Sequence, residues 1–185
     1  MKRFNITGLC IPSKHYMVDL TARVKEIKHL VDDGKYFTIN RARQYGKTTT
    51  LSSLRWALSD SYCVASVSFE KISEVGYVSE HAFVKAFCRL LKREIRNGLV
   101  IPGRILEEIT EYQNRKHDEA TLDELFDVLL EWCDESDKPI VLMIDEIDTA
   151  ANHQVFIDFL AQLRSYYLDR EDKETKRFNP SSSPV

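Results

Sequence analysis

The sequence contains no long hydrophobic run, no C-x-x-C pair and no large excess of one charge. No stretch approaches the roughly 20 apolar residues that a membrane span needs, so we expect no membrane partner and a cytoplasmic location. The cysteines (Cys10, Cys63, Cys88 and Cys133) are scattered, and three lie in apolar-patterned segments, which indicates reduced core thiols rather than metal ligands. A net charge of −3 argues against a dedicated nucleic-acid binder but leaves a local basic patch open.

What is present fits one soluble globular domain. The 185 residues are 43% hydrophobic and 30% charged. A chain of this length can bury a substantial core without metal or disulfide staples. Fold and function must therefore be sought in motifs rather than in composition.

Residues 41–48 end in Gly46-Lys47-Thr48, which is the ending of the P-loop pattern G-x-x-x-x-G-K-[ST]. The first glycine of the pattern is replaced by Arg41. In a P-loop, backbone N–H groups surround phosphates, the lysine neutralises them and the hydroxyl holds Mg²⁺. The context agrees, since residues 36–40 are predicted as a buried strand and residues 48–58 as a helix. An ordinary strand-turn-helix with a chance Gly-Lys-Thr is the alternative.

Under the P-loop hypothesis, Lys47 reaches the β- and γ-phosphates, Thr48 coordinates Mg²⁺ and Gly46 lets the backbone approach. Thr49 and Thr50, near the α-phosphate, are weaker candidates than these, because hydroxyls early in a helix also cap it or face solvent. Arg41 has two interpretations, a partner of phosphate or carboxylate and a solvated loop charge, and the same two apply to Arg43. The predicted cofactor-binding residues are Arg43, Gln44, Tyr45, Gly46, Lys47, Thr48 and Thr49.

A second block, residues 140–146, is an apolar run closed by Asp145 and Glu146. It has the Walker B arrangement, a buried strand whose tip presents two carboxylates. Asp145 would hold Mg²⁺ with Thr48, and Glu146 would orient and deprotonate the attacking water. We therefore predict Glu146 and Lys47 as catalytic residues. Asp148 either adds charge near the metal or caps a helix.

The rest of the chain alternates helices and strands. Asp19 or Thr21 is expected to cap the first helix, and a strand covers residues 62–69. Further helices are expected at 79–98 with Ser79 as its cap, at 121–132 with a capping box, and at 152–168, whereas residues 99–120 are expected to form a surface excursion around a short helix. This order predicts an α/β fold, a parallel sheet with flanking helices in three layers, and a ligand at the carboxyl ends of the strands.

Four segments together resemble the bacterial AAA-ATPase-like proteins: residues 4–8, 14–19, 37–48 and 143–148. P-loops of the type Arg-Pro-Arg-Arg-Phe-Gly-Lys-Ser/Thr occur in that family, so Arg41 is in keeping with it. The resemblance implies a P-loop ATPase of the additional-strand type, with ATP and Mg²⁺ as ligands. ATP is favoured over GTP because no guanine-reading Asn/Thr-Lys-x-Asp segment is present. The family also places adenine near residues 15–19.

The resemblance implies further strands after residue 168, including one that carries a sensor residue. Residues 171–185 form instead a polar, Ser/Pro-rich tail that we expect to be disordered. The expected organisation is thus a partial ATPase domain over residues 1–170, with its C-terminal strands missing. Longer relatives suggest self-association, or a fused or partner nuclease domain, as further partners.

Two functional hypotheses follow. In the first, the chain is an ATPase in which Mg²⁺-dependent hydrolysis drives a conformational switch of an unknown target. In the second, it is an ATP-binding or interaction module that does not hydrolyse. Lys47 and Glu146 favour the first hypothesis, and the missing sensor region favours the second.

Overall fold

The computed structural model describes residues 16, 19–39, 46–114 and 120–169. Most of the elements in these residues are helices, and two are strands. They are α1 (Thr21–Asp32), α2 (Lys47–Leu58), β1 (Cys63–Ser68), η1 (Phe69–Lys71), η2 (Glu74–Tyr77), α3 (Glu80–Arg96), α4 (Gly103–Asn114), α5 (Leu122–Glu135), β2 (Ile140–Asp145), η3 (Ile147–Thr149) and α6 (Gln154–Asp169).

The sheet of the described residues consists of β1 and β2, which pair in parallel. Their register runs from Cys63 opposite Ile140 to Ser68 opposite Asp145. The two strands therefore end at the same edge of the sheet. The segment that carries α3, α4 and α5 connects them, as a parallel pair requires.

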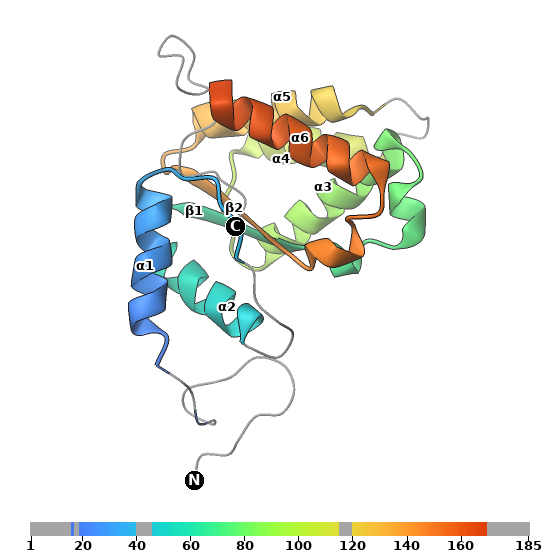
Figure 1. The fold of residues 1–185 in the computed structure, drawn as a ribbon. Coiled ribbons are helices and arrows are strands. Elements are labelled where there is room, and N and C mark those ends of the chain that lie inside the picture. Colours follow the sequence, from blue (N-terminus) through green and yellow to red (C-terminus); the bar gives the residue numbers. More distant parts are fainter. Residues whose placement is uncertain (1–15, 17–18, 40–45, 115–119, 170–185) are drawn as a thin grey trace.

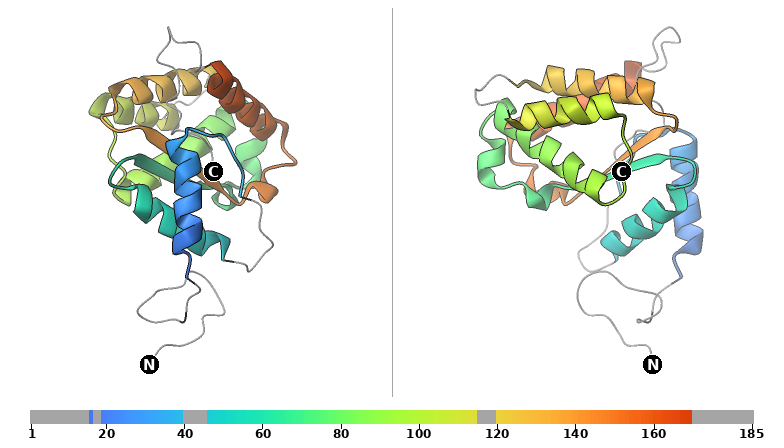
Figure 2. Two further views of the ribbon diagram at one scale, coloured as in Figure 1. Left: turned by 60° about the vertical axis from the view of Figure 1, so that its left-hand side comes forward. Right: turned by 180° about the vertical axis from the view of Figure 1, so that it is seen from behind.

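Helices cover both faces of the sheet, which gives the three layers expected from the sequence (Figure 1, Figure 2). Val64, Val141 and Met143 pack toward α1 and α2. Residues on the opposite face, including Leu142 and Ile144, join a larger cluster formed with α3, α4, α5 and α6. The near-continuous apolar run of β2 is explained by this burial on both faces.

The strand predicted at residues 36–40 is not formed in its described part, because residues 35–39 adopt no regular structure. Phe37 and Ile39 are nevertheless partly buried against the α1–α2 cluster. Their aromatic and β-branched character therefore identified burial correctly. A strand also needs a neighbour for its backbone groups, and the described residues provide none here.

For residues 99–120, the predicted short helix is confirmed, but the predicted surface excursion is wrong. The segment contains α4, a helix of 12 residues. Ile105, Ile109 and Tyr112 follow one another at helical spacing and are buried. They pack α4 against α3 and α5, so this segment belongs to the core.

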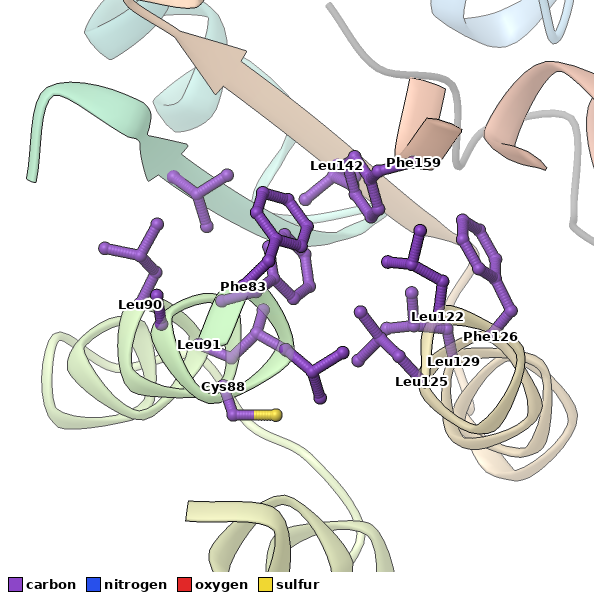
Figure 3. Close-up of a cluster of buried hydrophobic side chains, with 14 of the residues drawn as sticks. Phe83, Cys88, Leu90, Leu91, Leu122, Leu125, Phe126, Leu129, Leu142 and Phe159 are labelled. Atoms are coloured by element: carbon purple, nitrogen blue, oxygen red, sulfur yellow. The ribbon is translucent and has the colours of Figure 1, made fainter. Parts of the chain in front are cut away.

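The largest cluster is rich in phenylalanine. The ring centroids of Phe69 and Phe156 lie 4.8 Å apart, and Phe159 lies 5.1 Å from Phe87 and 5.3 Å from Phe83. Figure 3 shows side chains of α3 and α5 filling the space beneath the sheet together with Leu142 and Phe159. Phe69 directly follows β1, so this cluster also anchors the edge at which the strands end.

Two predicted helix caps are confirmed. Ser79 accepts a hydrogen bond from Ala82 N, and Thr121 forms a complete capping box with Glu124. At α1 the predicted cap differs, since Leu20 occupies the cap position while Asp19 accepts from Thr21 N. The helix predicted to end at Trp132 continues to Glu135. In the described segments, no helix combines the length and apolar content that a membrane crossing requires.

Phe159→Ala is expected to lower the free energy of unfolding by about 3–5 kcal/mol, because the removed ring leaves a cavity in the core. Phe159 is fully buried, whereas Ile157 on the same helix is 47% exposed. Ile157→Ala is the matched control and should change stability by no more than about 0.5 kcal/mol. Equilibrium denaturation in urea, followed by circular dichroism, measures both. Equal losses in the two variants would contradict the burial described.

Candidate functional site

Gly46 directs the chain into α2. Its φ of +75° lies in the left-handed region, which glycine adopts without a steric cost. A Cβ at this position would meet nothing within 4 Å, so the backbone conformation, and not crowding, favours glycine. Thr50 N donates to Gly46 O at 2.9 Å, and no side chain caps the helix within the described part. The amides of residues 47–49 therefore point out of the helix without an intrahelical acceptor.

Lys47 connects the first turn of α2 to the end of β2. Its Nζ lies 2.8 Å from Asp145 Oδ1 and 3.6 Å from Glu146 Oε1. The Lys47 side chain is 27% exposed, that of Asp145 16% and that of Glu146 34%. The structure thus brings together the lysine of the first motif and both carboxylates of the second, although about a hundred residues separate them in the chain.

The surroundings of Lys47 act on its pKa in opposite directions. Partial burial lowers it, while the hydrogen bond and charge of Asp145, followed by those of Glu146, raise it. The net result is a pKa above the ordinary lysine value. Lys47 is therefore a fixed positive charge at neutral pH.

Asp145 and Glu146 are held by hydrogen bonds close to the strand end. Asp145 Oδ1 accepts from Glu146 N at 2.9 Å, in addition to its contact with Lys47. Glu146 has φ 57° and ψ 44°, and it is the one non-glycine residue with positive φ in the part of the chain that the structure describes. Thr149 Oγ1 donates to Glu146 O at 2.8 Å.

The other predicted site residues are placed as follows. Thr48 is exposed, whereas Thr49 and Thr50 are buried, and Thr50 Oγ1 donates to Gly46 O at 2.9 Å. Asp148 is exposed within η3 and caps no helix. Arg41, Arg43, Gln44 and Tyr45 lie outside the described residues, as do most of the 14–19 segment and the 171–185 tail.

In a comparison with known protein families, the family model described as an AAA-like domain matches residues 8–178, and this is most of the chain. The chain belongs to the AAA-like domain family. No curated protein and no solved structure matches it significantly. Membership of this family indicates a nucleotide-binding, ATPase-like function.

A metal in this AAA-like domain would depend on few protein ligands. Among the described residues, no group of three or more histidine, cysteine, aspartate or glutamate side chains is arranged to hold an ion. Thr48, next to Lys47, and Asp145, in contact with Lys47, offer a hydroxyl and a carboxylate. Such a sparse oxygen set suits Mg²⁺, which keeps waters and takes ligands from substrate phosphates.

Two residues at the edge where β1 and β2 end were not predicted from the sequence. Ser68 pairs with Asp145 in the sheet register, and Thr149 binds the backbone of Glu146. Ser68 had a detectable signal, because it lies near the end of the strand predicted at residues 62–69 and parallel strands end at one edge. The role of Thr149 depends on the backbone conformation of Glu146, for which the sequence has no signal.

A cavity of about 610 Å³ lies at the opposite edge of the sheet, where the strands begin. Arg55, Cys63, Val100 and Lys138 are among its lining residues. Burial raises the pKa of the Cys63 thiol, against a smaller lowering by Lys138. A thiol of this kind is a poor nucleophile. The cavity is therefore not the candidate site of the AAA-like domain, in spite of its size.

His153 is the residue before α6. Its ring stacks on Tyr77 at a centroid distance of 4.2 Å. Its Nε2 lies 3.6 Å from a carboxylate oxygen of Glu74. His153 therefore packs against η2 rather than joining Lys47.

Asp145→Asn is expected to lower the pKa of Lys47, because the largest stabilising partner of the ammonium loses its charge. The folded pKa lies above the value of about 10.4 for an unperturbed lysine. The stability that this ion pair contributes is thus complete below that value and is lost as the pH rises through the folded pKa. An NMR titration of the Lys47 Cε resonance measures the shift.

The exposed carboxylate of Asp148 provides the control for this titration. Asp148→Asn should leave the Lys47 midpoint where it is in the unmodified chain. Titration of Lys47 at the same pH in the unmodified chain and in Asp145→Asn would contradict the ion pair.

Proposed function

We propose that this AAA-like domain binds ATP with its phosphates at the first turn of α2 and hydrolyses it in a Mg²⁺-dependent reaction. The observation that carries the proposal is the 2.8 Å contact between Lys47 Nζ and Asp145 Oδ1. It places a lysine, a helix N-terminus and two strand-end carboxylates at one edge of the sheet. These groups together form a site in which a phosphate chain and a cation are bound side by side.

The N-terminus of α2 is the part of the site that would bind phosphate. The amides of its first turn, which have no intrahelical acceptor, and the positive end of its dipole favour an anion, and Lys47 adds a full charge. An incoming phosphate competes with Asp145 and Glu146 for this lysine. Binding therefore exchanges one set of negative partners for another, and we propose this exchange as the local event of the conformational switch.

The two carboxylates have different roles, since Asp145 would bind the cation and Glu146 would act on the water. Thr48 and Asp145 are the residues that would hold Mg²⁺, which when bound supplies positive charge to the β- and γ-phosphate oxygens. Glu146, one third exposed, is accessible to water. In hydrolysis the oxygen of that water bonds to the γ-phosphorus, the bond to the β-bridging oxygen breaks, and Glu146 accepts a proton of the water. The products are ADP and phosphate.

One observation favours the second hypothesis, an ATP-binding module without turnover. Glu146 Oε1 lies 3.6 Å from Lys47 Nζ, and a carboxylate that contacts a cation is less available to a water molecule. Turnover requires that Lys47 leaves Glu146 when the nucleotide binds. Measurement of binding and of hydrolysis on the same samples distinguishes the two hypotheses.

We expect the purified chain to bind ATP in a Mg²⁺-dependent titration and to release phosphate. Lys47→Ala should abolish binding, since it removes the only cation placed by the described residues against both carboxylates. Glu146→Gln should bind ATP as the unmodified chain does and stop phosphate release, because the amide cannot take the proton. Isothermal titration calorimetry and a phosphate-release assay measure the two quantities.

Lys138→Ala is the matched control, because Lys138 is an exposed lysine at the opposite edge of the sheet. It should change neither quantity. Tight ATP binding by Lys47→Ala would overturn the site assignment. Binding without phosphate release by the unmodified chain would establish the non-hydrolysing module instead.

A further inference from the structure

The backbone at Glu146 is held in a conformation that its side chain disfavours. Its φ of 57° and ψ of 44° are left-handed helical values. A non-glycine residue held there costs of order 1–3 kcal/mol and persists where its surroundings impose it. The interactions around Glu146 must therefore compensate for this cost.

Hydrogen bonds restrain the peptide groups on both sides of Glu146. On the amino side, Glu146 N donates to Asp145 Oδ1 at 2.9 Å. On the carboxyl side, Glu146 O accepts from Thr149 Oγ1 at 2.8 Å. Thr149 N also donates to this oxygen, but the distance of 3.4 Å is longer than that of an ordinary hydrogen bond. The hydroxyl of Thr149 is thus the stronger restraint on the carboxyl side.

We propose that Thr149 is a positioning residue for Glu146, which orients the carboxylate of Glu146 toward the attacking water. The inference rests on the proposed ATPase function and adds a residue that touches neither ATP nor the metal. Rotation of the Glu146 backbone out of the left-handed region would turn its side chain away from Lys47. A misplacement of about 1 Å at a catalytic group can reduce the rate by about 100-fold.

The position of Thr149 makes this role testable. Its side chain is exposed, so its replacement removes little packing. Ile147, in the same short helix η3, packs on the hydrophobic core. Replacement of Thr149 leaves this packing in place. Thr149→Val keeps the shape of the side chain and removes the donor, whereas Thr149→Ser keeps the donor.

The first measurement is amide hydrogen exchange on the ligand-free chain. In Thr149→Val we expect faster exchange at residues 146–150 and unchanged exchange in α3, with protection restored in Thr149→Ser. This readout requires no nucleotide. Unchanged exchange at residues 146–150 in Thr149→Val would overturn the restraint itself.

The second measurement is ATP turnover and binding. Thr149→Val should lower kcat by about 10-fold or more with the ATP dissociation constant unchanged, and Thr149→Ser should restore kcat. An equal kcat in Thr149→Val and the unmodified chain, or a loss that persists in Thr149→Ser, would overturn the positioning role alone. An unmodified chain that binds no ATP would overturn the proposed function, and the positioning role with it.

Discussion

The contact between Lys47 and Asp145 is the interaction on which the candidate site depends. It connects the beginning of a helix on one face of the sheet to the end of a strand in the sheet itself. An exposed helix N-terminus and an ammonium group would repel one another if no anion lay between them. Asp145 and Glu146 provide that anion in the structure. Under the proposed function, the negative charge of the phosphates would substitute for charge that is already present, and the positive groups are arranged in advance.

The parts of the structure that the sequence predicted are those fixed by local chemistry. The apolar run after Pro139, closed by Asp145, identified β2, and the glycine-lysine turn identified the beginning of α2. The caps at Ser79 and Thr121 depend on contacts within one helical turn. The meeting of Lys47 with Asp145 and Glu146 was expected from the pairing of the two motifs, although the strand predicted before Lys47 is not formed in its described part.

The parts that the sequence did not predict depend on partners far along the chain. Phe37 and Ile39 have the composition of a strand, but their backbone finds no neighbouring strand in the described part. A short helix was expected within residues 99–120, yet Pro102 and Gly103 suggested a surface position, whereas Ile105 and Ile109 are buried. The binding of Thr149 to the Glu146 carbonyl follows from a left-handed backbone, which the residue types do not reveal. The roles of Lys47, Thr48 and Glu146 in binding and chemistry remain predictions.

The parallel pairing of β1 and β2 has a consequence for the order of folding. Residues 69–139 must be closed into a loop before Ser68 can lie beside Asp145, and closing a long loop has an entropic cost. The hydrophobic contacts among α3, α4 and α5 lie within that loop and are nearer in sequence. Contacts of short sequence separation form faster than distant ones. We therefore expect the helical layer to assemble first and the edge that carries Asp145 and Glu146 to form late, so that affinity for nucleotide appears only with the last step of folding.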